Sequence, residues 1–141
     1  MPAAAVLSAA SVLFNFYNWA TKGESADALI ALALPWLDDP QATPLSRVWF
    51  LVHLAFHEQI TRQYGRARKR MAEAEAIARE HGLSSVLFEI YHADVSAASA
   101  ARDVAGTKAA LERLRTVLNP ARRMDAAYFK HQEAALLLLS G

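Results

Sequence analysis

The stretch from Tyr64 to Gly82 carries the clearest pattern of apolar and polar positions in the chain. Ala67, Met71 and Ala74 recur at spacings of four and three residues and begin one apolar stripe, while charged residues fill most of the other positions. A glycine at the end of such a pattern is a natural stop, because it takes the left-handed conformation that closes a helix. We therefore predict one complete amphipathic helix whose narrow alanine face packs closely against another helix.

The same reasoning predicts seven helices, at 3–20, 24–37, 44–63, 64–82, 84–102, 105–118 and 120–140. The residues at 21–23 break the first helix, and the second turns Ala28, Leu29, Leu32 and Ala33 inward. Pro35 predicts a kink or an early end in the second helix, because proline cannot continue the backbone hydrogen bonding. Thr43-Pro44 and Asn119-Pro120 both read as a capping residue followed by proline at the first helical position.

The helix ends recur at a nearly constant interval. Aligned junctions fall at positions 23, 62, 102 and 141, so the intervals are 62−23=39, 102−62=40 and 141−102=39. After each junction small residues align (Ala28, Ala67 and Thr107), and then bulkier ones (Leu32, Met71 and Leu111). A fixed period with two helices in each unit indicates an α-solenoid. We predict an all-α, right-handed superhelix of about 3.5 hairpins in a single domain, with units at about 3–40, 41–82, 83–119 and 120–141.

Three blocks of the sequence, at 63–67, 102–106 and 73–82, look like parts of a known repeat. The first two resemble the turn of tetratricopeptide-type repeats, and the third resembles the helix that closes a unit in long-unit arrays of that kind. Such arrays are typical of sensor regions in large bacterial regulators of the LuxR and SARP classes. The resemblance implies a non-catalytic binding scaffold within a larger signalling or transcription regulator, with a protein or peptide partner or a small effector, and it carries over no catalytic residue.

Composition narrows the function classes further. Hydrophobic residues make up 54% of the 141 positions, and alternating Val, Ile and Thr runs are absent, so helices are favoured over strands. A net charge of +1 argues against direct nucleic-acid binding. The absence of cysteine excludes disulfides and thiolate chemistry. The apolar N-terminal stretch lacks a basic start, so we expect neither a signal peptide nor a membrane span, and we expect a cytoplasmic protein.

A candidate groove follows from the repeat alignment, because first helices line the concave surface of such arrays. Aligned positions on these helices would gather aromatic anchors and polar groups, as a peptide or small-ligand groove requires. The predicted groove residues are Trp49, Phe56, Glu89, His92, Tyr128 and His131. The alternative is that these positions point into the hairpin cores.

The end of the last helix predicts a second kind of surface. Its four consecutive leucines, Leu136, Leu137, Leu138 and Leu139, have no partner helix after them and would form an exposed apolar patch. The alternative function is therefore a structural or oligomerisation module that associates with itself, for example as a homodimer, through this helix.

Enzymatic chemistry is the weakest interpretation. His53 and His57 are four residues apart and could share a metal, but the zincin order and a third ligand are missing. The basic residues Arg62, Arg66, Arg68, Lys69 and Arg70 are expected to form a solvated outer face, because nearby glutamates partly neutralise them. No glycine-rich loop cradles phosphates and no elbow positions a nucleophile, so we predict neither catalysis nor a cofactor or metal.

Overall fold

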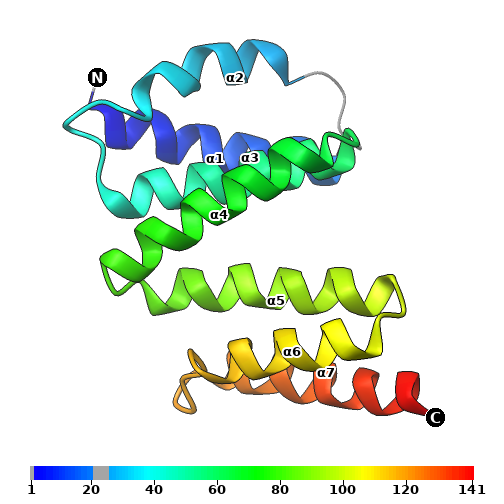
Figure 1. Ribbon diagram of the computed structural model, residues 1–141. Coiled ribbons are helices and arrows are strands. Elements are labelled where there is room, and N and C mark those ends of the chain that lie inside the picture. The colour runs from blue at the N-terminus through cyan, green and yellow to red at the C-terminus, as the bar shows by residue number, and fades with distance from the viewer. Residues whose placement is uncertain (1, 21–25) are drawn as a thin grey trace. The chain divides into compact units, whose positions relative to one another are not determined.

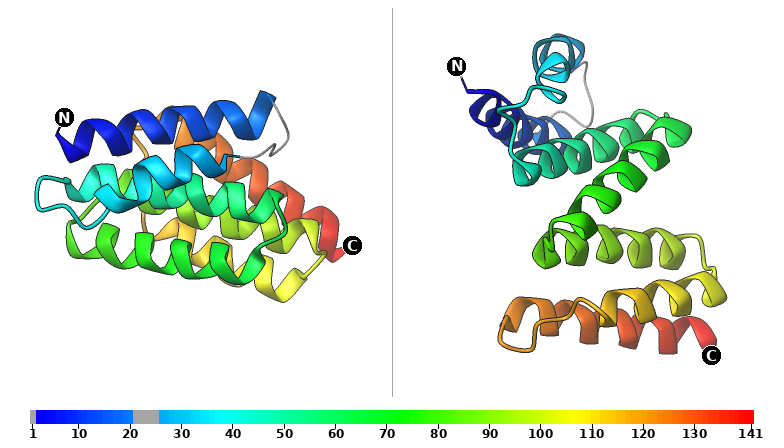
Figure 2. Two further views of the ribbon diagram at one scale, coloured as in Figure 1. Left: turned by 90° about the horizontal axis from the view of Figure 1, so that it is seen from above. Right: turned by 60° about the vertical axis from the view of Figure 1, so that its left-hand side comes forward.

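The computed structural model describes residues 2–20 and 26–141, and this part of the chain is all-α, without a strand. Figures 1 and 2 show the helices in three orientations. Their bounds are α1 Ala3–Ala20, α2 Asp27–Ala33, a 3₁₀ turn η1 Leu34–Trp36, α3 Pro44–Ile60, α4 Tyr64–Glu80, α5 Ser84–Ala100, α6 Val104–Arg115 and α7 Arg123–Ser140. The predicted break at 21–23 and the predicted helix start at Glu24 lie outside the described residues.

The chain divides into two compact units, an N-terminal unit Met1–Gly82 and a C-terminal unit Leu83–Gly141. The division falls between the second and third predicted hairpins. In the N-terminal unit α3 packs between α1 and α4, and in the C-terminal unit α6 and α7 pack on α5 and on each other. In each unit the odd-numbered helices run in one direction and the even-numbered helices return, as helical hairpins require (Figures 1 and 2). The right-handed superhelix stays a prediction.

Local sequence signals explain where α2 and α3 begin and end. Proline at position 35 stops α2 at Ala33 and leaves one 3₁₀ turn, as predicted. Thr43 caps α3, because its Oγ1 accepts a hydrogen bond from the Ser46 amide at 3.2 Å and Pro44 occupies the first helical position. The predicted inward face of α2 is wrong for Leu32 and Ala28: Leu32 is 66% exposed and Ala28 is exposed, since α2 packs only on α1 and η1 among the described elements.

The predicted start of the last helix is also wrong. Asn119 Oδ1 accepts a hydrogen bond from the Ala121 amide at 3.0 Å, which closes a tight turn instead of capping a helix. The helix α7 begins three residues later, at Arg123, with Arg122 as its N-cap. Asparagine favours both arrangements, so the dipeptide alone did not distinguish a turn from a cap.

Backbone geometry recurs at the predicted intervals. The N-caps of α3, α5 and α7 are Thr43, Leu83 and Arg122, at intervals of 83−43=40 and 122−83=39. The residues after these helices, Arg62, Arg102 and Gly141, all have positive φ, at 62°, 56° and 79°. Their intervals are again 40 and 39, so α3, α5 and α7 are equivalent elements.

The turns at Arg62 and Arg102 share one hydrogen-bond pattern. Gln63 N donates to Glu58 O at 2.6 Å and Arg62 N donates to Gln59 O at 3.0 Å. At the second turn, Asp103 N donates to Ala98 O and Arg102 N to Ser99 O, both at 3.0 Å. These are Schellman motifs, in which the left-handed residue is usually glycine. Both turns therefore hold an arginine in a conformation that costs free energy.

The first hairpin does not follow this register. The N-caps of α2, α4 and α6 are Ala26, Gln63 and Asp103, at intervals of 63−26=37 and 103−63=40. Ala67 and Thr107 are buried at equivalent positions, as the alignment predicts. The aligned Ala28 is exposed because α2 begins two residues later than the alignment assumed.

The positive φ values generate a stability prediction. Replacing Arg62 or Arg102 with glycine should raise the free energy of unfolding by about 1 kcal/mol each, because glycine takes the left-handed conformation without steric cost. Arg68, an exposed residue within α4, is the matched control. The substitution Arg68→Gly should instead lower stability by about 1 kcal/mol. Urea denaturation followed by circular dichroism measures all three, and a destabilising Arg62→Gly would contradict the left-handed turn.

Candidate functional site

The six predicted groove residues are divided between the two units. Trp49 and Phe56 lie on α3 in the N-terminal unit, while the other four lie on α5 and α7 in the C-terminal unit. The structure therefore gives two local surfaces, each between neighbouring odd-numbered helices. A single groove that contains all six residues stays a prediction.

In the C-terminal unit, α5 and α7 bring His92 and Tyr128 together. Their ring centroids are 5.1 Å apart, and the His92 ring also stacks on buried Phe88 at 6.2 Å. Gln132 Nε2 lies 3.2 Å from His92 Nε2 and donates to Ser96 Oγ at 3.3 Å. Tyr128 is 42% exposed and the His92 ring is half-buried, whereas Gln132 is buried beneath them. Gln132 was missed in the sequence because it lies one residue outside the aligned positions.

The equivalent surface of the N-terminal unit contains Trp49. This side chain is half-buried, its ring lies 5.6 Å from the His53 ring, and Trp49 O lies 2.8 Å from His53 Nδ1. Both residues line a cavity of about 440 Å³ whose opposite wall, on α1, includes Ser11 and Asn15. A half-exposed indole with polar groups opposite it can take an apolar side chain of a ligand and hold its backbone.

The other predicted groove residues are less constrained. Phe56 is half-buried, whereas Glu89 and His131 are exposed. An exposed carboxylate and an exposed imidazole are available to a partner, but neither is positioned by a hydrogen bond that defines its orientation in this structure.

The four C-terminal leucines do not behave alike. Leu137 and Leu138 are 74% and 86% exposed, while Leu136 and Leu139 are half-buried. Two of the four therefore present an apolar surface at the end of α7.

His53 and His57 lie in different surroundings. His53 faces the Trp49 cavity, whereas His57 is buried with its ring centroid 5.5 Å from that of Phe14. Across the described part of the chain, no cluster of three or more histidine and carboxylate side chains is arranged to hold a metal ion.

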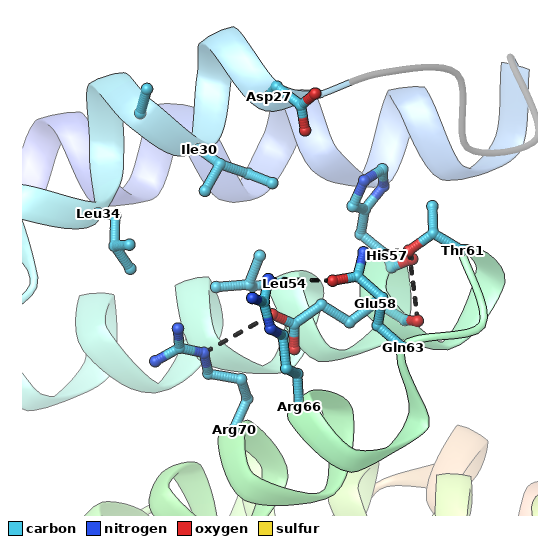
Figure 3. A pocket seen from close by; sticks show the side chains of 11 residues that line it. Asp27, Ile30, Leu34, Leu54, His57, Glu58, Thr61, Gln63, Arg66 and Arg70 are labelled. Atoms are coloured by element: carbon cyan, nitrogen blue, oxygen red, sulfur yellow. Dashed lines mark hydrogen bonds and ion pairs between the residues drawn. The ribbon is translucent and has the colours of Figure 1, made fainter.

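A second cavity, which the sequence did not predict, lies between α2, α3 and α4. Its volume is about 520 Å³ (Figure 3). In Figure 3, Ile30 of α2 and Leu34 of the 3₁₀ turn η1 lie on one side, and Arg66 and Arg70 come from α4 on the other. Glu58 lies between them on α3. The cavity lies where the backbone of α2 stays apart from the backbones of α3 and α4.

Glu58 is the most unusual residue of this cavity. Its side chain is buried, with only 5% of the residue exposed, and Oε2 has no hydrogen-bond partner. Arg70 Nε lies 3.8 Å from Glu58 Oε1, and Arg70 also faces Glu73 at 3.9 Å. A buried carboxylate with an unsatisfied oxygen is costly, so a protein retains it where it serves a purpose or where a donor arrives from outside.

Hydrogen bonds connect several of the residues that line the cavity. Arg66 Nη1 donates to Gln63 Oε1 at 3.1 Å, and Gln63 Nε2 donates to Thr61 Oγ1 at 3.0 Å. The Thr61 hydroxyl donates in turn to His57 O at 2.9 Å. Arg66 is thus connected to the last turn of α3 while its remaining guanidinium donors stay available.

Burial shifts the pKa values of two neighbouring groups, Glu58 and His57, in opposite directions. Burial raises the pKa of Glu58 above its ordinary 4.5, and the positive charges of Arg70 and Arg66 partly oppose that rise. Burial lowers the pKa of His57 below its ordinary 6.5, and the Asp27 carboxylate partly opposes that fall.

The repeat alignment shows that the charged residues of this cavity have uncharged equivalents 40 positions later in the sequence. At the 40-residue interval, Glu58 corresponds to Ala98, because 58+40=98. By the same interval Arg66 corresponds to Gly106 and Arg70 to Ala110. The hairpin α5–α6 forms without any of these charges, so the hairpin fold does not require them. The basic residues are predicted to form a solvated face, and this holds for the four that are exposed, namely Arg62, Arg66, Arg68 and Lys69. Arg70 is half-buried beside Glu58, and Arg66, although exposed, also lines the cavity.

The pKa shifts predict two opposing pH dependences. Folded Glu58 binds its proton more tightly than unfolded Glu58, so its contribution to stability falls as pH rises above 4.5. Folded His57 disfavours its proton, so its contribution falls as pH drops below 6.5. The double variant His57→Gln/Glu58→Gln, which lacks both groups, serves as the reference. As pH falls from 7 to 5, the free energy of unfolding of His57→Gln should rise relative to this reference, and that of Glu58→Gln should fall. Urea denaturation at each pH measures the difference, and slopes of equal sign would contradict the burial of one group.

No described helix is both long enough and apolar enough to cross a membrane. Comparison of the chain with protein-family models, with curated proteins and with solved structures gave no match. The resemblance to long tetratricopeptide-type units therefore rests on the three sequence blocks at 63–67, 73–82 and 102–106.

Proposed function

We propose that the chain is a non-catalytic interaction scaffold that binds a peptide or protein segment along the surfaces between its odd-numbered helices. The supporting observation is that both units carry an aromatic residue at the same place on such a surface. Trp49 lies beside α1 and Tyr128 beside α5, and their separation of 128−49=79 residues equals one interval of 40 plus one of 39.

The polar residues support the same function. His53 and Gln132 are also 79 residues apart, and each follows its aromatic residue by one helical turn. An aromatic anchor with an adjacent amide or imidazole matches the composition of binding hot spots, in which a rigid ring fills a pocket and a polar group fixes the orientation. Because the pair of an aromatic and a polar residue occurs once in each unit, an extended partner would contact both copies.

The wider context is part of the same proposal. Stacked as a right-handed tetratricopeptide-like solenoid, the chain would form a regulatory segment of a larger bacterial signalling or transcription regulator, and binding would pass along the stack. This context rests on the resemblance of the three sequence blocks and on the recurrence of the helix ends.

A second candidate function is self-association through α7. Met124, Tyr128, His131, Ala135 and Leu138 follow one another at spacings of four, three, four and three residues, the spacing of a helix–helix seam. Met124 and Leu138 are 63% and 86% exposed. The two candidate functions share Tyr128 and His131, but only self-association requires the leucines.

The peptide proposal is tested with a random peptide display library. Peptides selected on the wild-type chain should bind Trp49→Ala, Glu89→Ala and His131→Ala at least tenfold more weakly in fluorescence polarisation, because hot-spot truncations typically cost about 2 kcal/mol. The control Glu112→Ala removes an exposed glutamate from α6 and should leave affinity unchanged. Helicity by circular dichroism confirms folding. Unchanged binding in all three variants would rule out these surfaces.

The self-association proposal predicts a concentration-dependent dimer. The variant Leu137→Glu/Leu138→Glu should be a folded monomer, because two charges would be buried in the interface. Light scattering over a range of protein concentrations compares it with the wild-type chain. A wild-type monomer at every concentration would eliminate this function without affecting the peptide proposal.

A further inference from the structure

The cavity between α2, α3 and α4 has two chemically different walls. Ile30 of α2, Leu34 of η1 and Leu54 of α3 form an apolar wall. The last turn of α3 and the first turns of α4 supply Glu58, Arg66 and Arg70. At about 520 Å³ the cavity is within the size range of small-molecule sites, which combine an apolar surface with a few convergent polar groups.

The polar wall offers both an acceptor and donors. Oε2 of Glu58 is buried without a partner, so it needs a donor. Arg66 and Arg70 are one helical turn apart on α4, and each engages a protein acceptor with only part of its guanidinium group. Two neighbouring guanidinium groups suit a carboxylate, which accepts paired hydrogen bonds from arginine. A matching ligand therefore carries a cationic donor and a carboxylate on one end and an apolar group on the other.

The charge balance of the cavity favours the same ligand. Asp27 and Glu58 contribute two negative charges, and Arg66 and Arg70 contribute two positive ones. A purely anionic ligand would leave Glu58 unsatisfied and close to a like charge. A purely cationic ligand would approach both arginines. Only a ligand with one positive and one negative group compensates both the carboxylates and the guanidinium groups.

The hairpin α5–α6 provides an internal comparison for the hairpin α3–α4. Ala98, Gly106 and Ala110 occupy the positions of Glu58, Arg66 and Arg70, and the hairpin α5–α6 packs without them. Packing of a hairpin of this kind therefore does not depend on the three charges, which in α3–α4 line one cavity. Residues that break the local pattern at a cost in stability are expected at functional sites.

We propose that this cavity binds a small zwitterion of the amino-acid type with an apolar side chain. Its ammonium group donates to Glu58, its carboxylate accepts from Arg66 and Arg70, and its side chain packs on Ile30, Leu34 and Leu54. The site is separate from the peptide surfaces, since Trp49 and Tyr128 do not line it. A zwitterion here would be the small effector of the scaffold.

The experiment uses the full chain and three probes, L-leucine, L-phenylalanine and L-leucyl-L-leucine, in isothermal titration and ligand-observed NMR. At least one should bind, and 4-methylpentanoate and 3-methylbutylamine, which each lack one charge of leucine, should bind at least tenfold more weakly than leucine. The proposal is overturned if no zwitterion binds, or if either half-molecule binds as well as leucine.

Variants locate the binding. Glu58→Ala/Arg70→Ala installs the equivalent residues of the hairpin α5–α6 and should abolish binding, and Glu58→Gln, which keeps the side-chain shape, should weaken it at least tenfold. Arg68→Ala/Glu80→Ala removes a matched pair of exposed charges from α4 and should bind as the wild type does. If the first variant does not fold, Glu58→Gln decides the outcome. Binding that persists in folded Glu58→Gln at wild-type affinity would overturn the proposal, and Trp49→Ala should not change it.

Discussion

The close packing of α4 on α3 is the interaction on which the N-terminal unit and its cavity depend. Ala67, Ala74 and Ala78 of α4 are almost completely buried, and their small side chains let the two helix backbones approach. Because the alanine stripe faces α3, Arg66 and Arg70 at its edge are carried over the last turns of α3, where Glu58 lies. A larger residue in the stripe would separate the helices and move both arginines away from that carboxylate. The fold and the candidate site thus depend on the same three methyl groups.

Much of the architecture could be predicted from the sequence because its signals are local. The Thr43-Pro44 cap and the stop at Gly82 each depend on residues within one helical turn, and the structure has a helix boundary at each. The alanine stripe depends on spacing within one helix, and its alanines are buried in α4. The predicted helix start at Asn119-Pro120 and the predicted inward position of Leu32 were wrong for a different reason. Whether asparagine caps a helix or closes a turn, and whether a leucine is covered, depends on which other helix packs nearby.

The candidate sites were only partly predictable, and the cause is again physical. Trp49, His92 and Tyr128 could be found because aromatic residues at a repeating position mark a shared surface. The cavity could not be found in this way, because it exists only where α2 stays apart from α3 and α4. Glu58 looked like an ordinary helical glutamate in the sequence, and its significance comes from burial. Comparison of each charge with its equivalent 40 residues later was the one sequence signal for the site.

The Schellman turns have a consequence for how this chain can change its length. Arg62 ends one helix and Gln63 caps the next, so the connection has no spare residue, and the pair Arg102 and Asp103 repeats this arrangement. Inserting one residue after Arg62 would rotate α4 by about 100° around its axis and turn the alanine stripe away from α3. The connections at 38–43 and 116–122 are longer and can absorb an added residue. The connection between α4 and α5, at 81–83, is as short as those at 61–63 and 101–103. Natural variation in length should therefore accumulate at 38–43 and 116–122 and be excluded within the hairpins α3–α4 and α5–α6.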